Sequence, residues 1–259
     1  MEKPLIIGNW KCNPLTQKEA DHLFKAIGQE ARVAENSEII LCPPFVWLSL
    51  FSVAVKGSGK IKLGAQDGFW ERRGAYTGEV SMEMLRDIGC QYVILGHSER
   101  RKYFNETDEV INKKIKAALS VRLKPILCLG EESQDSFDSE GRSLNEVSLK
   151  IGDQLEKAIE GVSSVKVKDI IVAYEPVWAV GSGRPCLPDD AMKAVLFLRK
   201  TLTKIYSRNI AEKVTMLYGG SVDFKNADSY LDETGINGLL IGGASLNASD
   251  FNKIIRKFE

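Results

Sequence analysis

Eight short apolar runs recur along the chain, with segments of helical periodicity between them, and this alternation limits what the chain can fold into. Strands that alternate with helices predict a parallel sheet, and eight such units predict a closed (β/α)8 barrel. The chain has no break in composition, so we expect a single domain over residues 1–259. An open doubly wound sheet is the competing architecture. The expected strands are Leu5–Gly8, Ile39–Cys42, Ile61–Ala65, Tyr92–Leu95, Ile126–Leu129, Ile170–Tyr174, Val214–Leu217 and Leu239–Ile241.

Four of the intervening segments begin with recognisable helix-start signals. Thr16 and Glu19 form a capping-box pattern, Thr107 is a candidate N-cap, and Pro188 and Asn247 each open a helical pattern. The apolar faces expected for these helices comprise Leu23, Phe24 and Ile27; Val110, Ile111, Ile115 and Leu119; Val195, Leu196, Leu198 and Leu202; and Ile254 and Ile255.

Charge and cysteine content exclude several classes of protein. Lysine plus arginine and aspartate plus glutamate both number 35, which argues against a nucleic-acid or membrane-surface partner. No apolar run approaches 18 residues, and the first residues lack a signal-peptide pattern. Five cysteines without a C-x-x-C pair, together with two histidines, argue against a zinc site. We expect no metal and a reducing compartment, the cytosol.

The most informative single position is Glu175, which ends the continuous apolar run Ile170–Tyr174 and precedes Pro176. A run without alternation predicts a strand buried on both faces, so a carboxylate is expected at its carboxyl end. The following segment carries Val177 and Trp178 and has the glycine-rich tip 181–183. Covering a ligand would give these large apolar side chains a place to pack. A solvated glutamate before an ordinary turn is the alternative.

Other polar groups follow other strands and are therefore expected at the same rim of a barrel. Asn9 and Lys11 follow the first strand, His97 and Glu99 the fourth, and glycine pairs at 219–220 and 242–243 the last two. Glycines let backbone N–H groups approach an anion, so a phosphate site is expected after strands seven and eight. Each of these polar residues and glycine pairs, taken singly, could instead have a purely structural role. The 181–183 glycines resemble a dinucleotide-binding motif that Cys186 leaves incomplete, so nicotinamide binding is not predicted.

Six motifs, in order along nearly the whole chain, resemble the signatures of the triosephosphate isomerase family. The resemblance implies a TIM barrel that interconverts dihydroxyacetone phosphate and D-glyceraldehyde 3-phosphate through an enediolate, without an organic cofactor or metal. A lyase built on a phosphate-binding barrel and an inactive scaffold are the rival interpretations. The motifs are Asn9–Lys11, Gly74–Glu79, Gly96–Arg101, Ala173–Ala179, Tyr218–Val222 and Gly242–Leu246.

The resemblance also implies a role for each site residue. Glu175 would be the base, and His97 a neutral hydrogen-bond donor that stabilises the enediolate and shuttles protons. Lys11 would supply positive charge and Asn9 a hydrogen bond, while Glu99 would partner Lys11. The backbone N–H groups expected to hold the phosphate belong to Gly181, Ser221, Gly242 and Gly243.

Two further expectations concern an interface and a hinge. In the family, the loop that corresponds to Gln66–Glu79 inserts into a second subunit near Lys11, which implies a homodimer. Asp67 stands where the family pattern often has asparagine, and is expected to alter that contact. The small-residue hinge that the family has after the closing loop is replaced here by Arg184–Leu187, which includes Pro185 and Cys186. We therefore expect Cys186 to lie at a moving hinge and to be the most accessible of the five thiols.

Overall fold

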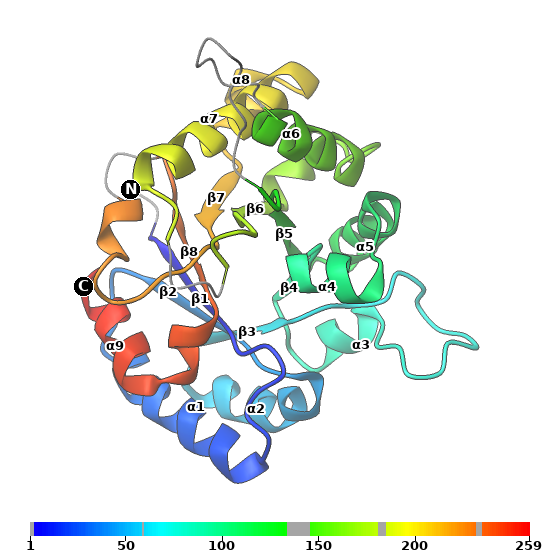
Figure 1. The fold of residues 1–259 in the computed structure, drawn as a ribbon. Coiled ribbons are helices and arrows are strands. Elements are labelled where there is room, and N and C mark those ends of the chain that lie inside the picture. Colours follow the sequence, from blue (N-terminus) through cyan, green and yellow to red (C-terminus); the bar gives the residue numbers. More distant parts are fainter. Residues whose placement is uncertain (1–2, 59, 134–145, 181–184, 232–234) are drawn as a thin grey trace.

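The strands close into one parallel barrel in the computed structural model, which describes residues 3–58, 60–133, 146–180, 185–231 and 235–259. Each strand pairs with its neighbours in sequence, and β8 pairs with β1, so the open sheet is excluded. The helices surround the strands on the outside (Figure 1). The strands are β1 (Leu5–Asn9), β2 (Glu38–Cys42), β3 (Ile61–Ala65), β4 (Tyr92–Leu95), β5 (Lys124–Leu129), β6 (Ile171–Tyr174), β7 (Thr215–Tyr218) and β8 (Gly238–Ile241).

Every expected strand is confirmed, with bounds that differ by no more than two residues. The longer α-helices are α1 (Gln17–Ala31), α2 (Phe45–Ser58), α5 (Asp108–Ser120), α6 (Glu146–Ala158), α7 (Pro188–Ile205) and α9 (Ala248–Arg256). The shorter helices are α3 (Met82–Asp87), α4 (Ser98–Phe104), α8 (Arg208–Ala211), η1 (Val167–Asp169), η2 (Asp228–Tyr230) and η3 (Gly243–Leu246). None of the helices in the described ranges is long and apolar enough to cross a membrane.

The helix-start predictions are confirmed at the atomic level. Thr16 and Glu19 form the complete capping box of α1, and the side chains of Thr107 and Asn247 accept backbone N–H groups of α5 and α9. Pro188 is the first residue of α7. One core prediction for α7 is wrong: Leu196 is 55% exposed. Val195, Leu198 and Leu202 follow the i, i+3, i+7 spacing of one helix face, whereas Leu196 lies about 100° around the helix from Val195.

The barrel strands are apolar on both sides because each side faces a different layer of core. Ile6 and Ile39 belong to the layer between strands and helices, while Ile7 and Ile40 belong to the layer inside the barrel. Successive side chains of a strand point to opposite faces, so a barrel wrapped in helices needs apolar residues at nearly every strand position. This two-sided burial explains the lack of alternation in the sequence.

A polar cluster fills the barrel interior at the amino-terminal ends of the strands. Lys62 Nζ lies 2.7 Å from Glu38 Oε2, and the Tyr92 hydroxyl donates to Glu38 Oε1. Lys124 Nζ lies 5.7 Å from the centroid of the Tyr92 ring. Burial alone would raise the pKa of Glu38, but the hydrogen bonds from Lys62 and Tyr92 hold that pKa below its ordinary value. The cluster therefore stabilises the folded state while Glu38 is ionised.

Replacing Glu38 by glutamine is expected to lower the free energy of unfolding by about 1–2 kcal/mol at neutral pH, because the charged acceptor is lost. A lowered folded-state pKa contributes stability above the unfolded-state pKa, and that contribution is lost as pH falls through the folded-state pKa. The difference from the parent should therefore shrink below about pH 4, as measured by denaturant unfolding across pH. Glu156→Gln, at an exposed residue of α6, is the control. A deficit that stays constant with pH would contradict the ion-pair explanation.

Candidate active site

A cavity of about 160 Å³ lies at the carboxyl ends of the barrel strands. Cavities that bind drug-sized ligands are typically about 300–1,000 Å³, so this cavity suits a smaller molecule. Its lining brings together residues at or just after the ends of β1, β4, β6, β7 and β8. The lining residues are Asn9, Lys11, His97, Glu175, Val180, Gly219, Gly220, Ser221, Val222, Leu240, Gly242, Gly243 and Ala244.

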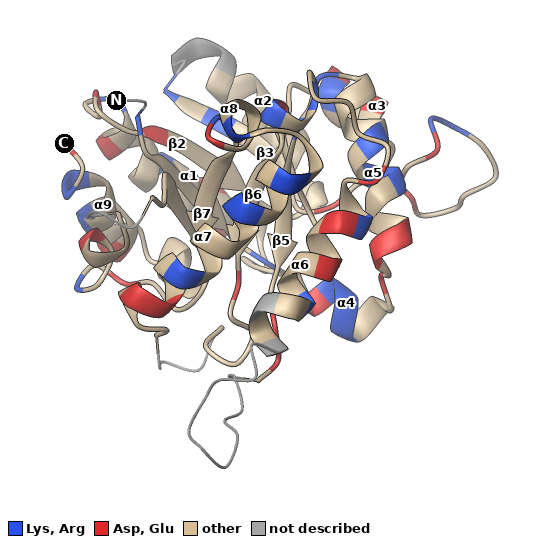
Figure 2. Cartoon of the chain, turned by 90° about the horizontal axis from the view of Figure 1, so that it is seen from above, with Lys and Arg blue, Asp and Glu red and all other residues tan. Residues whose placement is uncertain are grey.

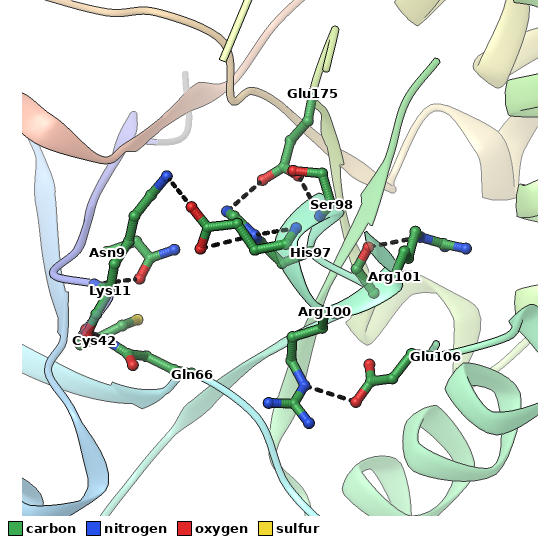
Figure 3. A network of polar contacts seen from close by, with 12 residues as sticks. Asn9, Lys11, Cys42, Gln66, His97, Ser98, Arg100, Arg101, Glu106 and Glu175 are labelled. Atoms are coloured by element: carbon green, nitrogen blue, oxygen red, sulfur yellow. Dashed lines mark hydrogen bonds and ion pairs between the residues drawn. The ribbon is translucent and has the colours of Figure 1, made fainter. Parts of the chain in front are cut away.

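Glu175 is 2% exposed and points into the cavity from the end of β6. Its backbone N–H donates to the Leu129 carbonyl at 2.7 Å, which continues the β5–β6 ladder one residue past β6. The carboxylate accepts the Ser98 N–H at 3.3 Å and lies 3.4 Å from His97 Nε2 (Figure 3). Burial, and after it the nearby charge of Glu175, raise the pKa of the Cys128 thiol. The Glu175 carboxylate is thus contacted at both of its oxygens.

His97 is the N-cap of α4, and its ring orientation follows from that position. The Glu99 N–H donates to His97 Nδ1 at 3.2 Å, so Nδ1 is an acceptor and carries no proton. The neutral ring then has its proton on Nε2, the nitrogen that faces Glu175 and the cavity.

Lys11 reaches the cavity through an unusual backbone conformation. Its φ of 52° lies in the left-handed region, which a non-glycine residue adopts only when its surroundings hold it there. Asn9 Oδ1 accepts the Lys11 N–H at 3.0 Å, and Gln66 Nε2 donates to the Lys11 carbonyl at 2.8 Å. Lys11 Nζ lies 2.6 Å from Glu99 Oε1, so the ammonium group is held by a carboxylate at the cavity rim. Because Oδ1 of Asn9 is engaged, its amide N–H groups remain to face a ligand.

Glycines after β7 and β8 bring the backbone to the cavity. A Cβ at Gly219 would lie 2.8 Å from Glu175 Cγ, so the glycine leaves room for the carboxylate. Ser221 and Gly242 line the cavity, and Gly243 begins η3 with open space where its Cβ would be. A helical turn thus starts directly after β8, as anion binding would need, whereas β7 is followed by a turn and not by a helix. Gly181, the fourth expected phosphate ligand, lies outside the described residues.

Several residues that support the site were not predicted. Glu131 follows β5 and is buried; its Oε1 accepts the Tyr174 hydroxyl at 2.9 Å and the Trp178 indole N–H at 2.8 Å. Burial raises the pKa of Glu131 despite these two donors. The indole of Trp178 is therefore anchored at the base of the segment after β6. An acidic residue just after an expected strand was the available signal in the sequence. The residues that hydrogen-bond to it lie more than 40 positions further along the chain.

Gln154 of α6 supports the same region through the backbone. Its side-chain amide both accepts from Gly130 N–H and donates to Gly130 carbonyl, each at 3.0 Å. A Cβ at Gly130 would lie 1.8 Å from the Glu175 carbonyl oxygen, so the two backbones touch. A lone glutamine on an amphipathic helix carries no sequence signal for this role.

The expectation that Cys186 is the most accessible thiol is wrong. Cys186 is 1% exposed, and Cys12 is the exposed cysteine among the five, all of which are free. Pro185 is exposed, but the chain turns inward at the next residue, where the Cys186 N–H donates to the Tyr218 hydroxyl at 3.2 Å. The prediction was based on the closeness of Cys186 to the glycine-rich tip in the sequence, which gives no information about its buried hydrogen-bond partners. Within the described ranges, no group of three or more His, Cys, Asp or Glu side chains is placed to hold a metal ion.

A closed parallel barrel with acid, imidazole and ammonium groups in a cavity at its carboxyl-terminal rim defines a (β/α)8-barrel enzyme. Comparison with known proteins narrows the class, because the model of one family, described as Triosephosphate isomerase, matches residues 4–258. The chain belongs to the triosephosphate isomerase family.

Curated relatives match along their whole length. The triosephosphate isomerase of Alkaliphilus oremlandii (strain OhILAs) is 46% identical over 255 residues, which cover 98% of this chain and 99% of the relative. That of Caldanaerobacter subterraneus subsp. tengcongensis is 44% identical with the same coverage. That of Endomicrobium trichonymphae is 43% identical over 256 residues, or 99% of each chain.

Gly219→Ala is expected to reduce isomerase turnover at least ~10-fold, because the new methyl group would displace the Glu175 side chain and catalysis is sensitive to shifts of about 1 Å. Steady-state kinetics with both triose phosphates would measure the loss. Gly28→Ala is the control, since a Cβ there meets its nearest neighbour, Ile61 Cδ1, at an ordinary 3.7 Å. Equal activity of the two variants would show that Gly219 does not constrain the carboxylate.

Proposed function

We propose that this chain interconverts dihydroxyacetone phosphate and D-glyceraldehyde 3-phosphate. The side chains that we propose take part are those of Asn9, Lys11, His97, Glu99 and Glu175. The observation that carries the assignment is the juxtaposition of Glu175 and His97, whose Oε1 and Nε2 atoms lie 3.4 Å apart at one cavity wall. A carboxylate base and a neutral N–H donor at one site are what proton transfer beside a carbonyl needs. The family membership of the chain supports the same reaction.

Glu175 is proposed as the base. It removes a proton from the carbon next to the substrate carbonyl; the C–H electron pair becomes the new C=C bond, and the carbonyl oxygen takes the negative charge of an enediolate. The same carboxyl group then returns the proton to the neighbouring carbon. A base that is 2% exposed exchanges its proton slowly with solvent and has few competing water contacts, which suits this two-way transfer.

His97 is proposed to act on the oxygens of the substrate. Its protonated Nε2 donates to the carbonyl oxygen and stabilises the charge that develops there, while Nδ1 stays engaged with the Glu99 N–H. A neutral imidazole matches the proton affinity of an enediolate better than an imidazolium does. It can therefore pass protons between the two oxygens without trapping the intermediate.

The remaining polar groups are proposed to bind and orient the substrate. Lys11 supplies fixed positive charge, and Glu99 holds its ammonium group in place through the 2.6 Å contact. The Asn9 amide donates to the reacting oxygens. Backbone N–H groups of Ser221, Gly242 and Gly243 hold the phosphate, and Gly181 is proposed as a further phosphate ligand. The chemistry so assigned uses side chains and backbone groups of this chain alone.

A coupled isomerase assay on purified protein, with Glu175→Asp as the diagnostic variant, tests this function. Shortening the side chain by one methylene retracts the base by about 1 Å, so kcat should fall at least ~10²-fold while KM changes much less. Glu38→Asp is the matched control, because it makes the same change at the opposite end of the barrel. Parent-like turnover in Glu175→Asp would overturn the assignment of the base, and an inactive parent would overturn the function.

We also propose that the chain forms a homodimer through the loop Gln66–Glu79, which projects from the body of the molecule between β3 and α3 (Figures 1 and 2). Residues 71–79 are all exposed in the single chain. The Phe69 ring packs on Trp70 and Tyr76, with centroids 4.1 and 4.7 Å apart, so the loop presents a preformed aromatic cluster. Tyr76 is exposed and Phe69 and Trp70 are partly exposed, and aromatic side chains are enriched at protein interfaces.

Asp67 supports the base of this loop from within its own chain. It is buried and accepts Lys114 Nζ at 2.7 and 2.9 Å, and Arg100 Nη2 lies 3.0 Å away. Glu106 Oε1 contacts the same two cations, so two acids and two bases balance in a closed network. Burial raises the pKa of Asp67 against the attraction of Lys114. The charge of Asp67 therefore points inward, and we propose that it stiffens the loop base rather than touching a partner subunit.

Sedimentation equilibrium is expected to give twice the 28.7 kDa chain mass at micromolar concentration. Tyr76→Asp should shift the protein toward monomer, because it places a charge in the proposed aromatic interface. Tyr103→Asp, which makes the same change at an exposed tyrosine of α4, shows whether the effect is specific to the loop. A fully active parent that sediments as a monomer would count against the dimer.

Thiol chemistry supports a proposal for the cellular location. All five cysteines are free, and they persist as thiols in a reducing compartment. We propose the cytosol, where triose phosphates formed in glycolysis and gluconeogenesis would meet the enzyme.

A further inference from the structure

Cys186 returns the chain from the segment after β6 to the start of α7, and two tyrosines hold its backbone from both sides. Its N–H donates to the Tyr218 hydroxyl at 3.2 Å, and the Tyr230 hydroxyl donates to its carbonyl oxygen at 2.6 Å. All three residues are buried. Both polar backbone groups at this point are therefore satisfied by side chains and not by solvent.

The two tyrosines also contact each other. Their rings stack with centroids 3.9 Å apart and an angle of 16° between planes. Each phenol has one proton, and that of Tyr230 is given to the Cys186 carbonyl. The Cys186 backbone and the two tyrosines thus form a closed ring of three contacts, which are two hydrogen bonds and one stacking contact.

The ring lies directly behind the cavity. Tyr218 is the last residue of β7, and Gly219, Gly220 and Ser221, which follow it, line the cavity wall. A Cβ at Gly220 would lie 2.2 Å from the Tyr218 hydroxyl oxygen, so this hydroxyl fills the space behind the glycine. Tyr230 is not among the cavity-lining residues and comes from η2, a separate element. Among the described residues, its contacts with Tyr218 and Cys186 connect it to the cavity wall.

We propose that Tyr230 is a positioning residue for the isomerase reaction, because its hydroxyl closes the ring that holds the Cys186 peptide against the back of the Gly219–Ser221 loop. This inference rests on the proposed function of that loop in phosphate binding. Without the hydroxyl, the Cys186 carbonyl loses its donor. The fraction of molecules in which the Cys186 peptide is held against the loop then falls. The affinity for a phosphate-bearing ligand falls by the same factor as this fraction.

Tyr230→Phe is the test, and Tyr206→Phe is its matched control. The Tyr206 hydroxyl also donates to one backbone carbonyl, that of Val162 at 2.8 Å, but it lies at the carboxyl end of α7. For Tyr230→Phe we expect the KM for dihydroxyacetone phosphate and the Ki of glycerol 3-phosphate to rise together, by about five- to fiftyfold, with a smaller change in kcat. For Tyr206→Phe we expect both constants to stay within about twofold of the parent, since additive effects are the rule for distant sites.

Alkylation of Cys186 provides a readout that does not depend on activity. Burial raises the pKa of this thiol to about 12, so in the parent it should react slowly with iodoacetamide. In Tyr230→Phe a loosened peptide should expose the thiol, and labelling should accelerate about tenfold or more, as followed at each cysteine by mass spectrometry. Cys12 is the exposed reference and Cys42 the buried one. Glycerol 3-phosphate should slow the labelling of Cys186 again.

The double variant Tyr218→Phe with Tyr230→Phe tests whether the two hydroxyls act as a unit. A ring broken at one point is already open, so the double variant should cost less than the sum of the single variants. The proposal is overturned if Tyr230→Phe matches Tyr206→Phe in KM, in Ki and in Cys186 labelling. An inactive parent would instead overturn the proposed function, and the labelling rates would still report on the ring.

Discussion

The closure of eight parallel strands into one hydrogen-bonded cylinder is the constraint on which the rest of this protein depends. The ladder between β1 and β8 brings the first and last strands together, with Gly8 opposite Ile241. A Cβ at Gly8 would lie 3.0–3.3 Å from Leu41, Ser245 and Phe251, so the seam is packed tightly. Since all strands run the same way, closure places every carboxyl end on one rim. Groups separated by more than 200 residues, such as Lys11 and Gly242, thereby meet in one cavity.

Closure alone does not position Glu175; the β5–β6 ladder does. The Glu175 N–H bonds to Leu129, and the Val177 N–H bonds to the Glu131 carbonyl, so the sheet continues past both strands. Gly130 makes this continuation possible, because no side chain fits between it and Glu175. The carboxylate is therefore held by backbone on one side and by the α4 terminus on the other, which fixes its distance from His97.

The contacts of Tyr218 and Tyr230 with the Cys186 backbone show how the chain is held in place behind the cavity. The Glu131 contacts with Tyr174 and Trp178 hold the start of the segment after β6, and the ring holds the point where the chain enters α7. Both attachments are made by hydrogen bonds of buried side chains. Such hydrogen bonds favour one arrangement of the chain over many.

Local sequence patterns determined the elements of this fold. Continuous apolar runs predicted all eight strands because both faces of each strand are buried, and Thr16, Thr107 and Asn247 marked helix starts because capping is local chemistry. The rim positions of Asn9, Lys11, His97 and Glu175 followed from strand order. Tertiary structure alone decided the burial of Cys186 and the roles of Glu131 and Gln154. These depend on partners distant in sequence, whose approach is set by packing, and no local pattern encodes packing.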